Sequence, residues 1–197
     1  MSFKPTILSD DLILLPLYTH DGEIVVVDTI EKFHKVKHEL FIDKIWGFDT
    51  ETKPSFVKGE SRTKRVALLQ LTNSRKTFLF RLNILPMQPE LLNFFSSPEY
   101  QKVGLAIRDD LKFLKHLKNF EPAGFIDLQS IVKGYGIDEL GLRNLAAIVL
   151  NLRISKSQQL SNWEAETLTE GQIKYAATDS WASREIYLKL INSEING

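Results

Sequence analysis

Short runs of apolar and β-branched residues, separated by turn residues, recur along the first two thirds of this chain. Runs of this length, rich in Val, Ile, Leu and Phe, are typical of β-strands buried in a sheet. Six segments fit the description: Glu23–Asp28, Ile45–Glu51, Arg65–Thr72, Lys76–Phe80, Gln101–Ala106 and Gly124–Leu128. Only Asn73-Ser74-Arg75 separates the third run from the fourth, which predicts a hairpin of antiparallel strands.

Apolar residues at helical spacing predict the helices. Four segments show it: 28–40, Pro89–Phe95, Ile107–Lys118 and a last helix from a capping box at Thr169 to about Ile191. Strands come first, strands then alternate with helices, and helices dominate from Asp138 onward. This order predicts an α/β protein on a mixed sheet, with residues 1–197 as one domain whose core covers about 23–191.

The second predicted strand ends in two carboxylates. Side chains two residues apart lie on the same face of a strand, so Asp49 and Glu51 point together, about 6–7 Å apart along the chain. Two buried negative charges repel, and a divalent cation such as Mg²⁺ or Mn²⁺ would offset the repulsion. The alternative is a strand that runs out into a polar turn before Pro54.

Two predicted helices carry further acidic residues on apolar stripes. In Ile107–Lys118, Asp110 falls on the face turned toward the core, while Asp109 lies on the solvated side. In the last helix, Tyr175 and Asp179 lie one turn apart at the start of an apolar row. Each has a structural alternative: helix capping for Asp110, and a tyrosine packed at the core edge beside a solvated aspartate.

Composition narrows the chemistry. The chain has 25 Lys and Arg, 25 Asp and Glu, and no cysteine, which excludes disulfides, zinc–thiolate sites and cysteine nucleophiles. A net charge of zero counts against a coating role on nucleic acid, but not against an enzyme that acts on it. No apolar run reaches the about 18–20 residues of a membrane span, and no secretion segment opens the chain. We therefore expect a cytoplasmic or other intracellular location.

Together, three motifs resemble those of the DEDDy 3′–5′ exonucleases, the group of ribonuclease D and the Werner syndrome exonuclease domain. They are Asp49-Thr50-Glu51 after a strand, Asp110 in GLAIRDDLKFL, and Tyr175-Ala176-Ala177-Thr178-Asp179. Further matches are VALLQL from Val66, FIDL from Phe125, and the segment from Lys156 to Ser161-Asn162-Trp163. The resemblance covers roughly residues 23–190. It implies a ribonuclease H-like fold with a five-stranded mixed sheet and helices on both faces.

The resemblance also implies the site and its chemistry. The family's metal ligands fall on Asp49, Glu51, Asp110 and Asp179, and its catalytic tyrosine falls on Tyr175. Two divalent metal ions, Mg²⁺ or Mn²⁺, would serve hydrolysis at the 3′ end of a nucleic acid, with release of nucleoside 5′-monophosphates. No obligate protein partner is evident. One departure is Glu166-Thr167-Leu168, where the family often has Arg-Pro ahead of the leucine.

Candidate substrate contacts are less specific. Thr50 lies between the paired carboxylates, and a basic cluster of Lys58, Arg62, Lys64 and Arg65 would contact the backbone phosphates. Trp163 would stack on a terminal base. A solvated loop is the alternative for the basic cluster, and core packing is the alternative for Trp163.

Two other functions remain open from the sequence. One is a non-catalytic nucleic-acid-binding module, although all four carboxylates and the tyrosine are present. The other is a different ribonuclease H-like nuclease, such as an endonuclease, against which Tyr175 argues. The sequence does not decide between DNA and RNA, between single strands and recessed 3′ ends, or between the two metals.

Overall fold

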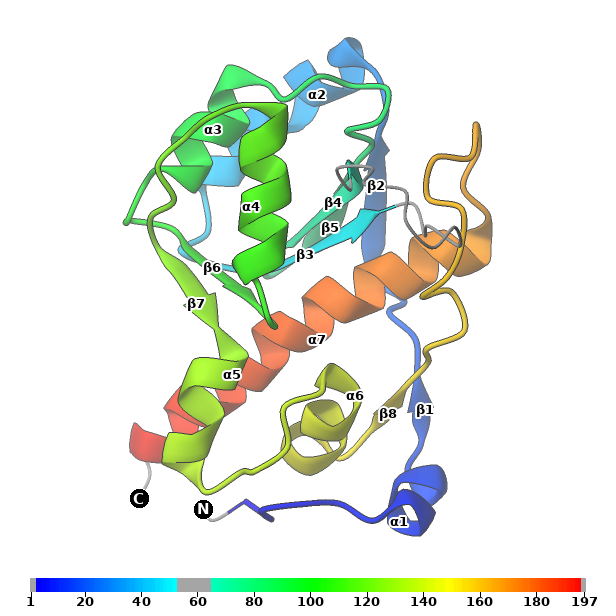
Figure 1. The fold of residues 1–197 in the computed structure, drawn as a ribbon, viewed down its shortest axis with the longest axis vertical. Coiled ribbons are helices and arrows are strands. Elements are labelled where there is room, and N and C mark those ends of the chain that lie inside the picture. Colours follow the sequence, from blue (N-terminus) through cyan, green and yellow to red (C-terminus); the bar gives the residue numbers. More distant parts are fainter. Residues whose placement is uncertain (1–2, 53–64, 196–197) are drawn as a thin grey trace, which may run out of the picture.

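A mixed sheet of six strands runs through the centre of the molecule (Figure 1). The computed structural model describes residues 3–52 and 65–195. The strand order is β2 (Glu23–Val27), β5 (Lys76–Phe80), β4 (Val66–Thr72), β3 (Ile45–Thr52), β6 (Gln101–Gly104) and β7 (Phe125–Asp127). The central strand β4 is antiparallel to β3 and to β5, and the other three pairs are parallel.

All six apolar runs form strands, and the hairpin between β4 and β5 is confirmed. The five-stranded sheet that the resemblance implied is wrong in number, because the three residues of β7 pair with β6 and extend the sheet. A separate pair of two-residue strands, β1 (Leu17–Tyr18) and β8 (Arg153–Ile154), was not expected. Strands of two residues are too short to produce a pattern of their own.

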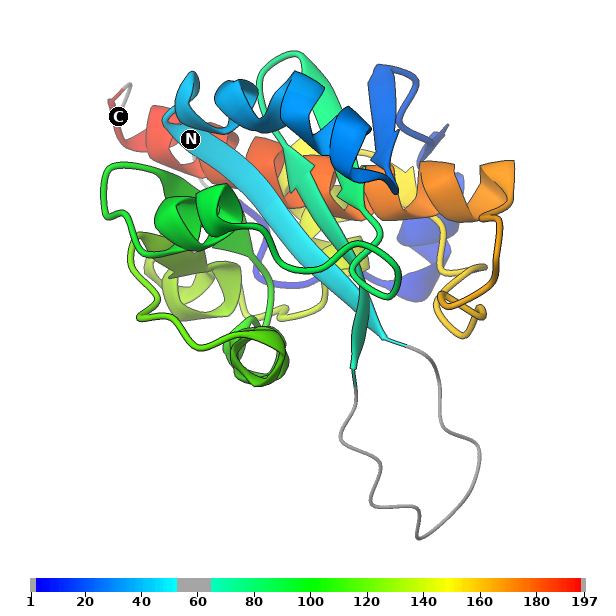
Figure 2. The ribbon, with the colours of Figure 1, turned by 90° about the horizontal axis from the view of Figure 1, so that it is seen from above.

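Helices cover both faces of the sheet (Figures 1 and 2). On one face α2 (Ile30–Val36), α3 (Pro89–Phe95) and α4 (Arg108–Leu117) enclose an aromatic-rich core. On the other face lies the long helix α7 (Glu170–Ile195). The 3₁₀ helix Lys37–Phe41 packs against α2 and α3 on the first face. Short elements pack beyond α7: α1 (Ser9–Leu14), α5 (Leu128–Ile131), α6 (Leu142–Leu145), the pair β1–β8, a 3₁₀ helix (Val132–Tyr135) and a π-helix (Ala146–Leu150).

Helix α7 begins with the predicted capping box. The Thr169 hydroxyl accepts from the backbone N–H of Gln172 at 3.2 Å, and the Gln172 side chain accepts from the Thr169 N–H at 3.0 Å. These two bonds fix the first turn of the helix one turn ahead of Tyr175. In the described part of the chain, no helix is both long and apolar enough to cross a membrane.

Helix α7 approaches β3 most closely at Gly47. A Cβ atom on Gly47 would lie 1.8 Å from the carbonyl oxygen of Ser180, so only glycine permits this approach. Beside it, the Ser180 hydroxyl and the Thr72 hydroxyl of β4 are 2.7 Å apart and fully buried. The helix therefore sits on the sheet at a distance set by Gly47, two residues before Asp49.

We predict that Gly47→Ala displaces α7 from β3. The added methyl group meets backbone atoms that cannot rotate away, so we expect a loss of about 1–3 kcal/mol in the free energy of unfolding. Denaturant unfolding of purified protein measures it. The matched control is Gly134→Ala, because no atom lies within 4 Å of the added methyl group there. Equal stability of the two variants would contradict the prediction.

Candidate active site

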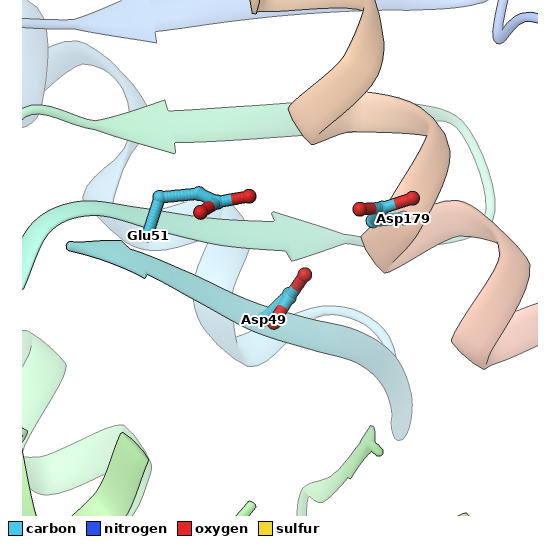
Figure 3. A group of neighbouring side chains, drawn as sticks. All are labelled: Asp49, Glu51 and Asp179. Carbon is cyan, nitrogen blue, oxygen red and sulfur yellow. The ribbon is translucent and has the colours of Figure 1, made fainter. Parts of the chain in front are cut away.

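Three carboxylates from two elements meet on the α7 side of the sheet (Figure 3). Asp49 and Glu51 lie two residues apart on β3, on the same face as Gly47, and α7 brings Asp179 to them. One carboxylate oxygen from each residue lies within 4.8 Å of the others. Among residues 3–52 and 65–195, no second group of three or more His, Asp or Glu side chains clusters in this way.

Burial raises the pKa of each of the three groups. Removal from water raises the pKa of Glu51 to about 9, and repulsion by Asp179 and Asp110 adds to the rise. Burial likewise raises the pKa of Asp179 to about 7, while a hydrogen bond from Tyr175 and attraction by Lys156 oppose it. The pKa of Asp49 is also raised well above its ordinary value, by burial first and by repulsion from its acidic neighbours second. The buried triad therefore resists losing its protons, and a bound cation would stabilise the deprotonated, negatively charged form.

Tyr175 stands one helical turn before Asp179, as the sequence predicted. Its pKa is raised, mainly by burial and then by repulsion from Asp179 and Glu51. The phenol is therefore protonated at neutral pH and can donate a hydrogen bond but not act as a base. Behind it lies Trp163, with ring centroids 6.1 Å apart.

Asp110 lies at the start of α4, next to the triad but outside the 4.8 Å group. The hydroxyl of Thr50 donates a short hydrogen bond to its carboxylate. Burial raises the pKa of Asp110 to about 6, and Asp109 and Asp127 add to the rise by repulsion. The prediction that Asp110 is less solvated than Asp109 is borne out, because Asp109 is exposed and Asp110 is half-buried.

A cleft of about 300 Å³ opens over the triad. Its lining residues are Asp49, Thr50, Glu51, Leu105, Gly141, Leu142, Arg143, Ile154, Ser155, Lys156, Gln159, Tyr175, Asp179 and Ser183. Arg143, Lys156 and Gln159 on the wall opposite β3 had no role in the sequence-based prediction. Lys156 entered the sequence analysis only as the first residue of a segment that matches the family, without a role of its own. Arg143 was not predicted, because no periodic pattern distinguishes it from a surface residue.

The predicted substrate contacts separate into four groups. Thr50 lines the cleft, and its hydroxyl donates to Asp110. Trp163 is fully buried, which corresponds to the core-packing alternative and leaves no ring face open to a base. Arg65 is exposed beside the first residue of β4 and does not line the cleft. Lys58, Arg62 and Lys64 lie outside the described residues.

The segment that departs from the family pattern is tied to the sheet by Arg81. This side chain follows β5, is 3% exposed, and donates to the carbonyl oxygens of Ala165 and Glu166. The next fixed points are Trp163 and Leu168, both buried. The chain before α7 is therefore held in place without the Arg-Pro pair.

The donor set suits a hard divalent cation. Mg²⁺ and Mn²⁺ prefer carboxylate oxygens, and the triad offers three such side chains on two packed elements. The three groups are already close together, and a cation would offset the burial and the repulsion that raise the pKa values of Asp49 and Glu51. The residues present therefore fit a divalent metal site.

Comparison with known proteins agrees with this geometry. The sequence pattern of a 3′–5′ exonuclease family matches residues 24–194. The chain is 30% identical to ribonuclease D of Gluconacetobacter diazotrophicus over 174 residues, which is 85% of this chain and 42% of that protein. It is 32% identical to the mouse Werner helicase–exonuclease over 74% of this chain and 11% of that protein.

Solved structures share the fold. The exonuclease domain of Aedes aegypti Nibbler superimposes with a TM-score of 0.78 at 22% identity, covering 87% of this chain and 90% of that one. Escherichia coli RNase D gives a TM-score of 0.77 at 22% identity, covering 86% of this chain and 44% of that one. The expected ribonuclease H-like fold is therefore confirmed. The chain spans less than half the length of the Gluconacetobacter and mouse relatives. The match of the family pattern to residues 24–194 shows that the chain belongs to the 3′–5′ exonuclease family.

Proposed function

We propose that this chain is a metal-dependent exonuclease that hydrolyses the last phosphodiester bond at the 3′ end of a nucleic acid. The observation that carries the proposal is the convergence of Asp49, Glu51 and Asp179 within 4.8 Å in a cleft beside Tyr175. In this proposal residues 1–197 act as one exonuclease domain, and the cytoplasmic location remains a prediction. The products are nucleoside 5′-monophosphates.

In the proposed site, Asp49, Glu51 and Asp179 would hold one cation, and Asp49 and Asp110 would hold a second. Two divalent cations, Mg²⁺ or Mn²⁺, supply Lewis-acid chemistry for an in-line displacement at the scissile phosphate. In the structure the Asp110 carboxylate accepts a hydrogen bond from Thr50, and the same carboxylate would become a ligand of the second cation. The carboxylates of the chain therefore act as positioned anions rather than as general bases.

Tyr175 orients the attacking water. Its hydroxyl stays protonated because burial and the neighbouring carboxylates raise its pKa, so it donates a hydrogen bond at the reacting centre. A donor that is already fixed by its helix needs no reorganisation during the reaction.

The opposite wall of the cleft binds the substrate backbone. Arg143 and Lys156 face the carboxylates across the cleft, and within residues 3–52 and 65–195 neither forms an ion pair. Cationic side chains position a phosphate backbone without reading its sequence. Trypanosoma brucei RNase D, which has this fold with a TM-score of 0.75, is solved with the RNA U12, so RNA is the first substrate to test.

We predict that the chain shortens 5′-labelled oligonucleotides from the 3′ end only when Mg²⁺ or Mn²⁺ is present. Asp49→Asn keeps the shape of the side chain and removes a charge shared by both cations, so we expect activity to fall at least about 10³-fold. Gel analysis of matched DNA and RNA substrates gives the direction of digestion and the preferred sugar.

A circular single strand is the control for this digestion. It has no 3′ end, and its cleavage would indicate an endonuclease instead. Binding of oligonucleotides by folded protein, without cleavage of any of them, would support the non-catalytic module and end the exonuclease proposal.

We predict that a divalent cation stabilises the protein more as pH rises. Glu51 has a pKa of about 9 in the folded chain against an ordinary value of 4.5. Between these two pH values, the metal-free folded state therefore binds more protons than the unfolded state. Its contribution to stability is present at low pH and is lost as pH rises toward 9. Thermal unfolding with and without Mg²⁺, at both ends of the window, measures the difference. Asp179→Asn should flatten the pH dependence, and an Mg²⁺ effect equal at all pH values would refute the prediction.

We predict that Tyr175→Phe separates catalysis from metal binding. Loss of the hydroxyl should lower kcat by about 10²-fold while the metal dependence of the remaining activity is unchanged. Steady-state kinetics at several Mn²⁺ concentrations test this. A variant with unchanged kcat would remove Tyr175 from the proposed mechanism.

A further inference from the structure

The carboxylate of Asp127 links three backbone N–H groups from two segments. Its Oδ1 accepts from Ala106 at 2.9 Å and from Gln129 at 3.0 Å, and its Oδ2 accepts from Ile107 at 3.2 Å. The bond from Gln129 caps α5, the helix that Asp127 itself begins. The other two bonds leave that helix and hold the loop between β6 and α4.

This loop has features that make it dependent on an outside partner. Ala106 has φ of 55°, a left-handed conformation that costs an alanine roughly 1 kcal/mol or more. The residue that begins α4, Ile107, has no side chain able to cap the helix. Asp127 therefore satisfies N–H groups at the strained turn and at the start of α4 that the loop cannot satisfy itself.

The end of β6, just before this loop, packs tightly against β3. A Cβ atom on Gly104 would lie 2.8 Å from the carbonyl oxygen of Phe48, the residue before Asp49. From this point the chain turns at Ala106, enters α4, and reaches Asp110 within the first turn. Only a short segment thus separates the contact with β3 from Asp110, and the Asp127 carboxylate holds this segment at Ala106 and Ile107.

We infer that Asp127 is a positioning residue of the active site: by holding Ala106 and Ile107, it sets where Asp110 stands relative to Asp49. The inference rests on the proposed role of Asp110 as a ligand of the second cation. Asp127 itself does not line the cleft above the triad. Its effect on the reaction passes through the backbone of the β6–α4 loop.

Asp127→Ser distinguishes this role from simple capping of α5. Serine is a good N-cap, so it retains the bond from Gln129. Its shorter side chain cannot reach the N–H groups of Ala106 and Ile107. Adding Ala106→Gly tests the mechanism further, because glycine adopts positive φ without strain and keeps the turn with less support.

The experiment counts bound Mn²⁺ by electron paramagnetic resonance and measures kcat, KM and thermal unfolding for the 197-residue chain. We expect Asp127→Ser to weaken one of two Mn²⁺ sites and to lower kcat, each by about 10–100-fold, with a small change in KM. The unfolding temperature of the metal-free protein should stay close to that of the wild type. Ala106→Gly in the same chain should restore part of both losses.

Two results with the variants would overturn the inference. One is a wild-type-like Mn²⁺ titration and kcat in Asp127→Ser. The other is a loss of activity that follows a lower unfolding temperature and is not reduced by Ala106→Gly. If the wild type binds two Mn²⁺ ions but degrades no oligonucleotide, the proposed function fails, and the Mn²⁺ titration still decides the role of Asp127. Wild-type binding of a single Mn²⁺ ion would overturn the role of Asp127 as well.

Discussion

Repulsion among buried carboxylates is the constraint on which this structure depends. Asp49, Glu51 and Asp179 are held within 4.8 Å of one another although the free chain would separate them. Such an arrangement persists only where the elements carrying the charges cannot move apart. The fold meets this requirement by placing two of the groups on a central strand and the third on a long helix fixed to that strand at Gly47. The stability of the sheet–helix contact therefore balances the electrostatic cost of the site.

The fourth carboxylate, Asp110, is held in a different way from the other three. Asp110 lies on α4, which covers the opposite face of the sheet from α7, and it reaches the site around the edge where β3 extends beyond β6. Its position depends on the three-residue connection between β6 and α4 and on one hydrogen bond from Thr50. The site thus combines three groups at one sheet–helix contact with a fourth group on a separate helix that follows a short loop.

The sequence predicted the features that depend on local pattern. The six strands, the hairpin at Asn73-Ser74-Arg75 and the capping box at Thr169 each arise from neighbours in the chain, and all are present. The predictions that failed or were not made depend on contacts between distant residues. For example, Thr178 of α7 is buried, and its hydroxyl accepts from the backbone N–H of His20, far away in the chain. Likewise, Arg143 and Lys156 enter the cleft only because the segment through α6 and β8 folds back over α7. No hydrophobic periodicity in the sequence predicts that this segment folds back over α7.

The charge distribution implies that metal and substrate bind in a linked way. The chain has no net charge, so its overall field neither attracts nor repels a polyanion, and the local field decides. In and beside the cleft, four acidic side chains outnumber the two cations of the opposite wall, Arg143 and Lys156. The raised pKa values favour protonated carboxyl groups in the metal-free site, so bound divalent cations would replace these protons, bring positive charge into the cleft and raise its affinity for a phosphodiester. Because linkage is reciprocal, bound nucleic acid must then raise the affinity of the site for its cations by the same factor.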